Sequence, residues 1–255
     1  MNKISDPRYG DNFVGRGEKI DELKEKIENN GIVVITGDRG IGKTNLMLVV
    51  KEDMEKEKEF HHISKGSIFA DRLSEIFKPP LLSKIKGIST LVGGISWDSG
   101  KNPLLECMVK SKERIIFVED AQELDRKTID LIFDASRRNE RLRFILEIAT
   151  PYKPAEKLGR GPDESVEVKE LSNKSTAELV KGVCPDLLDM AVRRIVSLSK
   201  GYPYVARSLA YICDRKKSNC SISSGIKFYS AAKFRRFYIG VHSDAHLWHS
   251  LYQKR

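Results

Sequence analysis

The chain has 255 residues and 40% of them are hydrophobic, enough for one large domain or two modest ones with a real core. No apolar run approaches the ~18 residues of a membrane span and residues 1–7 lack the apolar core of a secretion signal, so we expect a cytoplasmic protein without a membrane partner. The net charge of +9 is concentrated in residues 215–255, and the four scattered cysteines form no C-x-x-C pair, which argues against a zinc site or a disulfide scaffold.

The first predicted element is an amphipathic helix. It follows the segment Phe-Val-Gly-Arg at residues 13–16, and its apolar positions Ile20, Leu23 and Ile27 share one face. Acidic residues suit its first turns, and the Asn-Asn-Gly of residues 29–31 is typical of a helix end.

A phosphate-binding loop is predicted at residues 37–44, which read G-D-R-G-I-G-K-T. The apolar run 32–36 before it favours a strand, and a helix is expected after it. Glycines let the backbone N–H groups approach phosphate oxygens without a Cβ in the way. Lys43 would place its charge between the β- and γ-phosphates, and Thr44 would offer its hydroxyl to Mg²⁺. The pattern therefore predicts a nucleoside triphosphate and Mg²⁺ as ligands.

The next segments alternate between helix and strand. We expect a helix after Thr44, a short strand over 60–64 with His61 and His62 at its polar steps, and a helix from about Ser67 to Phe77. Residues 88–98 alternate around a Gly-Gly step, which suggests a β-hairpin.

A second chemical landmark follows at residues 114–124. Four apolar residues, 115–118, fit a strand buried on both faces of a parallel sheet, and Glu119 and Asp120 come directly after it. Open α/β sheets bind ligands at the carboxyl ends of their strands, so these carboxylates are candidate catalytic residues. The alternative is a pair of acids that only cap the end of a strand.

The remaining pattern predicts a helix over 125–139, a strand over 142–150 and a linker over 152–162. A last short strand is expected at 166–168. Helices should follow at 176–182 with Ser172 as N-cap, then from Asp186 as N-cap to Leu198, and then from Pro203.

The tail, residues 215–255, interleaves nine basic residues and one acid with aromatic side chains. Cations and aromatics together suit phosphate contact and base stacking, so DNA is a candidate partner of the tail. The alternative is a small extension with an aromatic core and solvated charges. His242, His246 and His249 share one helical face, for which a polar surface is favoured over a metal site.

Three stretches together resemble one family. The Phe-Val-Gly-Arg segment with its acidic helix, the phosphate-binding loop, and the Val-Glu-Asp-Ala-Gln-Glu-Leu of residues 118–124 are similar to the archaeal-type P-loop ATPases of the STAND and AAA+ branch, which include origin-recognition ATPases. The resemblance covers roughly residues 12 to 210. It implies an α/β fold: a three-layer α/β/α nucleotide-binding domain with a parallel sheet (1–165), a helical lid (166–214) and a basic extension (215–255).

The resemblance also implies roles for individual residues. Phe13 and Val14 would contact the adenine, Arg16 would be structural or nucleotide-sensing, and Thr150 would sense the γ-phosphate, with Glu147 as the alternative. Pro203 would begin the lid helix. A sensor arginine is expected where Tyr204 stands, so either Arg207 replaces it or the lid does not sense phosphate. The loop contributes the rest of the expected ATP site: Gly37, Asp38, Arg39, Gly40, Ile41, Gly42, Lys43, Thr44 and Asn45.

The acidic pair departs from the family order, which is Asp followed by Glu. Carried over by position, Glu119 would join Thr44 in holding Mg²⁺, and Asp120 would orient the attacking water, although Asp is one methylene shorter than Glu. We therefore expect an ATPase switch with slow hydrolysis of ATP to ADP, acting on DNA. The alternative is a nucleotide-gated scaffold or signalling module with little turnover. Arg137 and Arg138 are candidate trans-acting arginine fingers of a homo-oligomer, or else solvated surface residues.

Overall fold

The computed structural model describes residues 13–64, 69–77, 102–159 and 161–215. They fall into two compact units: Arg16–Lys169, and a helical unit whose described residues are 13–15 and 170–215. The expected boundary after residue 165 thus lies four residues later along the chain. The hairpin expected at 88–98, the tail beyond residue 215 and the three histidines within it lie outside the described residues.

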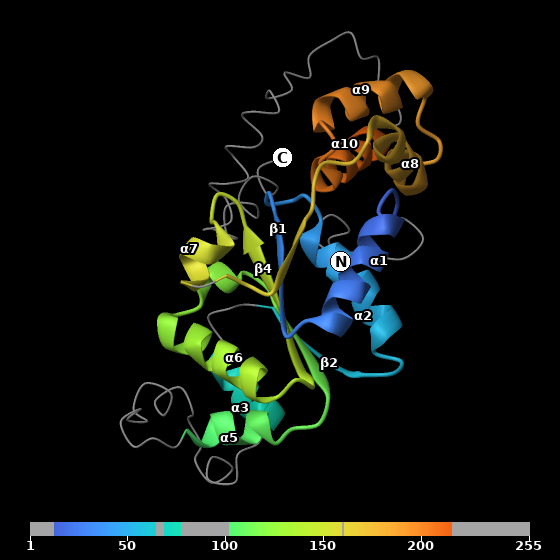
Figure 1. Cartoon of the computed structure of the whole chain (residues 1–255). Helices are drawn as coiled ribbons and strands as arrows, with labels where there is room; N and C mark the ends of the chain where they lie inside the picture. The colour runs from blue at the N-terminus through green and yellow to red at the C-terminus, as the bar shows by residue number, and fades with distance from the viewer. Residues whose placement is uncertain (1–12, 65–68, 78–101, 160, 216–255) are drawn as a thin grey trace. The chain divides into compact units, whose positions relative to one another are not determined.

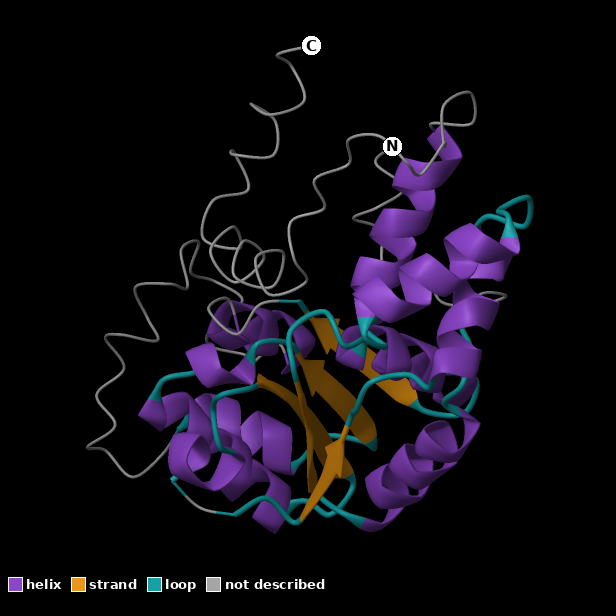
Figure 2. Cartoon of the chain, turned by 90° about the horizontal axis from the view of Figure 1, so that it is seen from above, coloured by secondary structure: helices purple, strands orange, loops and turns teal. Residues whose placement is uncertain are grey.

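A five-stranded parallel sheet is the centre of the larger unit (Figure 2). Its strands are β1 (Ile32–Gly37), β2 (Glu59–Ile63), β3 (Arg114–Val118), β4 (Leu142–Ala149) and β5 (Glu164–Glu167), in the spatial order β2-β3-β4-β1-β5. The predicted parallel sheet is confirmed. Because β4 lies between β1 and β3, the segments that follow the phosphate-loop strand and the acidic strand flank the end of β4.

Helices cover both faces of this sheet (Figure 1). The helices α1 (Gly17–Asn29) and α2 (Lys43–Met54) pack on one face, while α3 (Phe69–Phe77), α5 (Pro103–Val109) and α6 (Arg126–Arg138) pack on the other. The arrangement is the expected three-layer α/β/α fold. Asp125 caps α6 by accepting a hydrogen bond from the Thr128 N–H at 2.8 Å.

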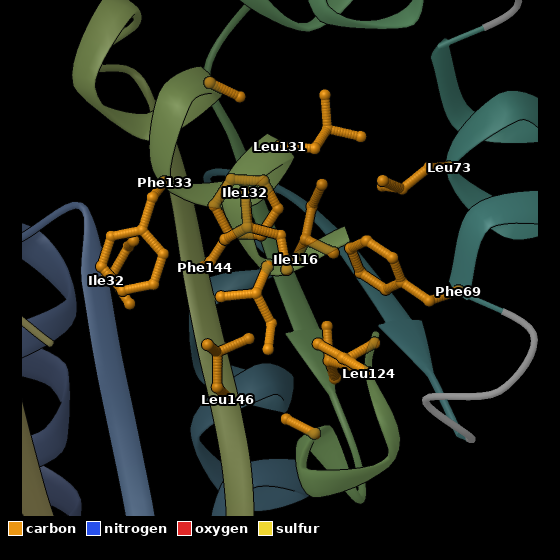
Figure 3. Close-up of a cluster of buried hydrophobic side chains, with 14 of the residues drawn as sticks. Ile32, Phe69, Leu73, Ile116, Leu124, Leu131, Ile132, Phe133, Phe144 and Leu146 are labelled. Atoms are coloured by element: carbon orange, nitrogen blue, oxygen red, sulfur yellow. The ribbon is translucent and has the colours of Figure 1, made fainter. Parts of the chain in front are cut away.

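Strand alternation divides the apolar residues between the two faces. Ile116, Phe144 and Leu146 point toward α3, α5 and α6 and form the large core drawn in Figure 3. Their neighbours along the strands point the other way, toward α1 and α2. Glu147 is one of these neighbours, so the sheet directs its carboxylate toward the helix that begins at the phosphate loop.

Two short helices occupy segments without a predicted element of their own. The helix α7 (Pro154–Leu158) lies inside the expected linker, which is therefore only partly irregular. Pro154 starts it and Gly159, with φ 68°, ends it, as is usual for a helix bounded by proline and glycine. The 3₁₀ helix η4 (Ala121–Glu123) directly follows the acidic pair.

The described part of the smaller unit contains three helices: α8 (Asn173–Val183), α9 (Asp189–Ser199) and α10 (Pro203–Arg215). Ser172 caps α8 as predicted, by accepting a hydrogen bond from the Ser175 N–H. The prediction of Asp186 as N-cap is wrong, since the N-cap position of α9 is Leu188, whose side chain makes no capping hydrogen bond. A turn closed by the Leu187 N–H and the Cys184 carbonyl takes up the residues before it. None of the helices described here is long and apolar enough to cross a bilayer.

Gly37, the last residue of β1, is a position where a side chain should be costly. Its φ is +146°, and a Cβ added there would lie 2.5 Å from the Val168 carbonyl oxygen. We expect Gly37→Ala to lower the free energy of unfolding by about 1–3 kcal/mol, measured by urea denaturation. Gly17→Ala is the matched control, because a Cβ there meets nothing within 4 Å. Equal stability of the two variants would contradict this account.

Candidate nucleotide-binding site

The loop between β1 and α2 has the backbone that phosphate binding requires. Three of its glycines have positive φ: Gly37 (146°), Gly40 (77°) and Gly42 (98°). Gly42 is the N-cap of α2, so the first N–H groups of that helix face the loop. The result is a strand–loop–helix junction that has glycine at each of its three positive-φ positions.

Lys43 is the first residue of α2 and is almost fully buried, with 4% of its surface exposed. Its ammonium group donates hydrogen bonds to the carbonyl oxygens of Gly37 and Asp38, each at 3.1 Å. The side chain thus folds back over the loop that it follows.

Glu147 contacts both polar side chains at the start of α2. The Thr44 hydroxyl donates to Glu147 Oε2 at 2.9 Å, and Lys43 Nζ lies 3.5 Å from Glu147 Oε1. Glu147 is paired with Ile35 of β1 and is only 8% exposed. Burial raises the pKa of Glu147 above its ordinary value, while Lys43 and the Thr44 hydroxyl act in the opposite direction. The negative charges of Glu119 and Asp120 raise this pKa further.

The two acids that follow β3, Glu119 and Asp120, contact side chains other than Lys43 and Thr44. Glu119 Oε1 lies 3.0 Å from Nε2 of His62, whose ring stacks on Phe117 at a centroid distance of 5.0 Å. Asp120 adopts a left-handed conformation with φ 49°, and its Oδ1 accepts a hydrogen bond from Gln122 Nε2 at 2.7 Å.

Thr150, the predicted sensor at the end of β4, is exposed. Its hydroxyl donates to the carboxylate of Asp38 in the phosphate loop. The structure thus connects both candidate sensors to the phosphate loop and the start of α2: Thr150 contacts Asp38, and Glu147 contacts Lys43 and Thr44.

Arg16 connects the loop to the ends of the larger unit. Its guanidinium donates to the carbonyl oxygens of Ile41, at 2.6 Å, and Lys169, at 3.1 Å. Arg16 is 7% exposed, and burial lowers its pKa to about 10, so it is charged at neutral pH. Within the described part of the chain its Nη1 has no hydrogen-bond partner.

We expect Arg16→Ala to destabilise the larger unit by about 2–3 kcal/mol, because two buried carbonyl groups lose a charged donor. Arg16→Lys keeps the charge but has a smaller, differently shaped donor group, so an intermediate loss is expected. The measurement is the free energy of unfolding in urea. A wild-type value for Arg16→Ala would show that these two contacts contribute nothing.

The larger unit therefore brings together most of the predicted site. The loop residues 37–45, Glu119, Asp120, Glu147 and Thr150 all lie at or beside the carboxyl ends of β1, β3 and β4. Phe13, Val14, Pro203 and Arg207 belong to the helical unit, where Val14 packs against the apolar cluster of α8, α9 and α10. Their contacts with a nucleotide stay predictions.

Arg137 and Arg138 are exposed at the end of α6. Arg137 also lines a polar cavity of about 550 Å³ beside Gly31 and Ile32. This cavity is at the amino end of β1, whereas the phosphate loop follows its carboxyl end.

His62 and Gln122 were not predicted as site residues. Their positions depend on the sheet: the parallel register sets His62 beside Phe117, two residues before Glu119. Gln122, in η4 after β3, connects Asp120 to the end of β4. Its amide nitrogen donates to Asp120, and its amide oxygen accepts a hydrogen bond from the Ala149 N–H at 3.3 Å.

The donor set fits MgATP. The glycine loop leaves room for phosphate oxygens, and hydroxyl and carboxylate oxygens are the ligands that Mg²⁺ prefers. No three His, Cys, Asp or Glu side chains among the described residues are grouped to hold a metal ion by themselves. Thr44 and Glu119 would therefore hold Mg²⁺ only together with nucleotide oxygens.

No protein-family model matches the chain, and no curated protein matches it significantly. Solved structures do match. A Walker-type ATPase of Pyrococcus abyssi has a TM-score of 0.59 and 17% identity over 98% of this chain and 80% of its own. The replication initiator DnaA, bound to AMPPCP and single-stranded DNA, has a TM-score of 0.54 and 20% identity over 83% and 69%.

A STAND protein with a tetratricopeptide repeat sensor from Pyrococcus horikoshii has a TM-score of 0.51 and 20% identity. The match covers 77% of this chain but only 29% of that protein. At these identities the similarity concerns the fold. Together with the glycine loop and its lysine, it shows that this chain has the P-loop ATPase fold found in STAND proteins and replication initiators.

Proposed function

We propose that the chain binds MgATP at residues 37–45 and uses ATP binding and slow hydrolysis to ADP as a conformational switch. One observation carries the proposal: the ammonium of Lys43 and the hydroxyl of Thr44 converge on one point at the carboxyl edge of a parallel sheet, above a loop of positive-φ glycines. These are the two side chains that a P-loop uses for the β- and γ-phosphates and for Mg²⁺.

Different residues of the chain would bind the phosphates, hold Mg²⁺ and orient the attacking water. Backbone N–H groups of the loop and Lys43 bind and orient the phosphates, and Thr44 and Glu119 hold Mg²⁺. Bound Mg²⁺ would neutralise charge on the β- and γ-phosphates. Asp120 would orient the attacking water, and Thr150 would contact the γ-phosphate.

Slow turnover is supported by the partners of the two acids. His62 already contacts Glu119, and Gln122 already donates to Asp120. Asp120 also has a side chain one methylene shorter than that of glutamate, which shortens its reach toward an attacking water molecule. The same observations favour a second candidate, a nucleotide-gated scaffold with little ATPase activity.

Single-turnover hydrolysis of radiolabelled ATP separates the two candidates. If the chain is an ATPase, Asp120→Asn should slow hydrolysis by about 10²–10⁴-fold, the usual contribution of a positioned base. Glu156→Gln, on the exposed side of α7, is the matched control. Wild-type hydrolysis no faster than that of Asp120→Asn would exclude the enzyme and leave the scaffold.

We propose DNA as the partner of residues 215–255. The composition of this segment supports it, and the DnaA structure of similar fold was solved with single-stranded DNA. Titration of single-stranded and duplex DNA across salt concentrations tests the proposal, since phosphate contacts make affinity fall as salt rises. Unchanged affinity after deletion of residues 216–255 would exclude the tail as the binding surface.

We further propose a reducing, cytoplasmic setting and a homo-oligomer. The scattered cysteines of the sequence, which form no C-x-x-C pair, support the reducing, cytoplasmic setting. The homo-oligomer is supported by the exposure of Arg137 and Arg138, because arginine fingers must reach the nucleotide of a neighbouring subunit. Sedimentation velocity with and without MgATP tests the second point, and a monomer under both conditions would contradict it.

A further inference from the structure

Glu147 holds the two side chains that a bound nucleotide would need. Thr44 donates its hydroxyl hydrogen to one carboxylate oxygen, at 2.9 Å, and the Lys43 ammonium lies 3.5 Å from the other. Both Lys43 and Glu147 are more than nine-tenths buried. Without nucleotide, the carboxylate and the ammonium therefore compensate each other's charge inside the protein.

A nucleotide phosphate changes this balance. A phosphate group that drew Lys43 toward itself would remove the one ammonium or guanidinium group recorded, among the described residues, within ion-pair distance of Glu147. The carboxylate would then be buried beside a polyanion, with Glu119 and Asp120 adding further negative charge nearby. Buried charge without a counter-ion is strongly unfavourable. A divalent cation that arrives with the nucleotide supplies the missing positive charge.

We propose that Glu147 makes nucleotide binding conditional on the divalent cation, so that the loop accepts Mg²⁺-nucleotide and rejects the free nucleotide. This inference rests on the proposed function, and it assigns to Glu147 a selective role that differs from sensing the γ-phosphate. ADP should show the effect as well as ATP, since the β-phosphate already reaches Lys43.

The other two acids are less suited to this role. Glu119 contacts His62, and Asp120 accepts from Gln122, so neither depends on Lys43 for a partner. Glu147 alone among the three contacts Thr44, the hydroxyl proposed to bind Mg²⁺. Removal of the charge at Glu147 should therefore tighten binding without Mg²⁺, whereas removal at Glu119 should only weaken binding with Mg²⁺.

The test is equilibrium titration of ADP into the full chain at fixed ionic strength, once with excess Mg²⁺ and once with EDTA. For the wild type, the Kd should rise roughly 100-fold in EDTA, within the usual range for coupled ligands. In Glu147→Gln the ratio should fall by about tenfold or more, mainly because the Kd in EDTA decreases. Glu147→Met removes the same charge and serves if the glutamine variant does not fold. Glu156→Gln should keep the wild-type ratio.

The outcomes are distinct. An unchanged ratio in a folded Glu147 variant, or a ratio that falls only because binding with Mg²⁺ weakens, overturns the inference and leaves nucleotide binding intact. A wild type that binds ADP equally well under both conditions also overturns it, without any variant. A wild type that binds neither ADP nor ATP under either condition overturns the proposed function itself.

Discussion

Replacement of Lys43 by methionine is expected to weaken MgATP binding by roughly 10- to 100-fold and to slow any turnover by about 10²–10³-fold. The ammonium lies at the start of α2 beside the glycine loop, where its charge would be shared between two phosphates. Methionine keeps a long, unbranched side chain but provides neither charge nor donor. Titration of a fluorescent ATP analogue measures the affinity, and single-turnover hydrolysis measures the rate.

Lys56→Met is the matched control for this experiment. Lys56 follows α2 and is mostly exposed, with a surface ion pair to Asp53 as its recorded contact. Its loss should leave binding within about twofold of the wild type, since surface pairs contribute little. If Lys43→Met and Lys56→Met bind MgATP equally well, the loop is not a phosphate site.

Lys43→Met should also destabilise the fold. Removal of one partner from a buried ion pair leaves the other charge uncompensated, at a cost of about 3–5 kcal/mol. Glu147 would then keep only the Thr44 hydroxyl of its two contacts at the start of α2. In Lys43→Met/Glu147→Gln most of the loss should be regained, because the amide oxygen still accepts from Thr44 and no charge is buried.

The pH dependence of this loss has a definite sign. Burial raises the pKa of Glu147 in the folded protein above 4.5, so folding favours the protonated carboxyl. The stability contributed by such a group is fully present below the unfolded pKa and is lost as the pH rises through the folded pKa. The deficit of Lys43→Met should therefore be smallest below the ordinary pKa of glutamate and should grow as the pH rises toward neutral.

The stability deficit and its pH dependence are measured by urea denaturation at several pH values. The wild type, both single variants and the double variant are compared. A deficit that does not change with pH would mean that Glu147 is not the charge left unpaired. A double variant as unstable as Lys43→Met would mean that Lys43 stabilises the fold through its bonds to the Gly37 and Asp38 carbonyls instead.

The layered fold could be predicted because its core strands and the helices between them have different apolar patterns. Continuous apolar runs such as 115–118 indicate strands buried on both faces, and the helices between them show a 3.6-residue period. The phosphate loop was equally accessible, since its spacing reflects a backbone requirement that only glycine meets at tight points. These local signals placed Lys43, Thr44 and the acids after β3 in one region.

The contacts of Glu147 and His62 could not be derived in the same way. Both depend on which strands are neighbours and on their register, and these are set by packing across the whole sheet. Glu147 reaches the start of α2 because β4 lies beside β1, with Ile35 opposite it. Glu147 was an alternative sensor only through the family resemblance, and its partners were not evident from the sequence.

Short elements were harder for a related reason. The β5 strand has only one buried residue, Val166, and its pairing with β1 holds it in the sheet. The sequence predicted a strand at 166–168, two residues later than β5 begins, so the expected domain boundary after residue 165 falls inside β5. At Asp186 the sequence has a good capping residue, but the turn at Cys184 and Leu187 delays α9 to Asp189.

The most direct test of the account is the affinity for MgATP of wild type and of the double variant Lys43→Met/Glu147→Gln, which should stay folded. Isothermal titration should give saturable one-site binding to the wild type and a Kd at least tenfold higher for the double variant. Equal affinities of two folded proteins, or no binding to the wild type, would contradict a nucleotide site at this loop.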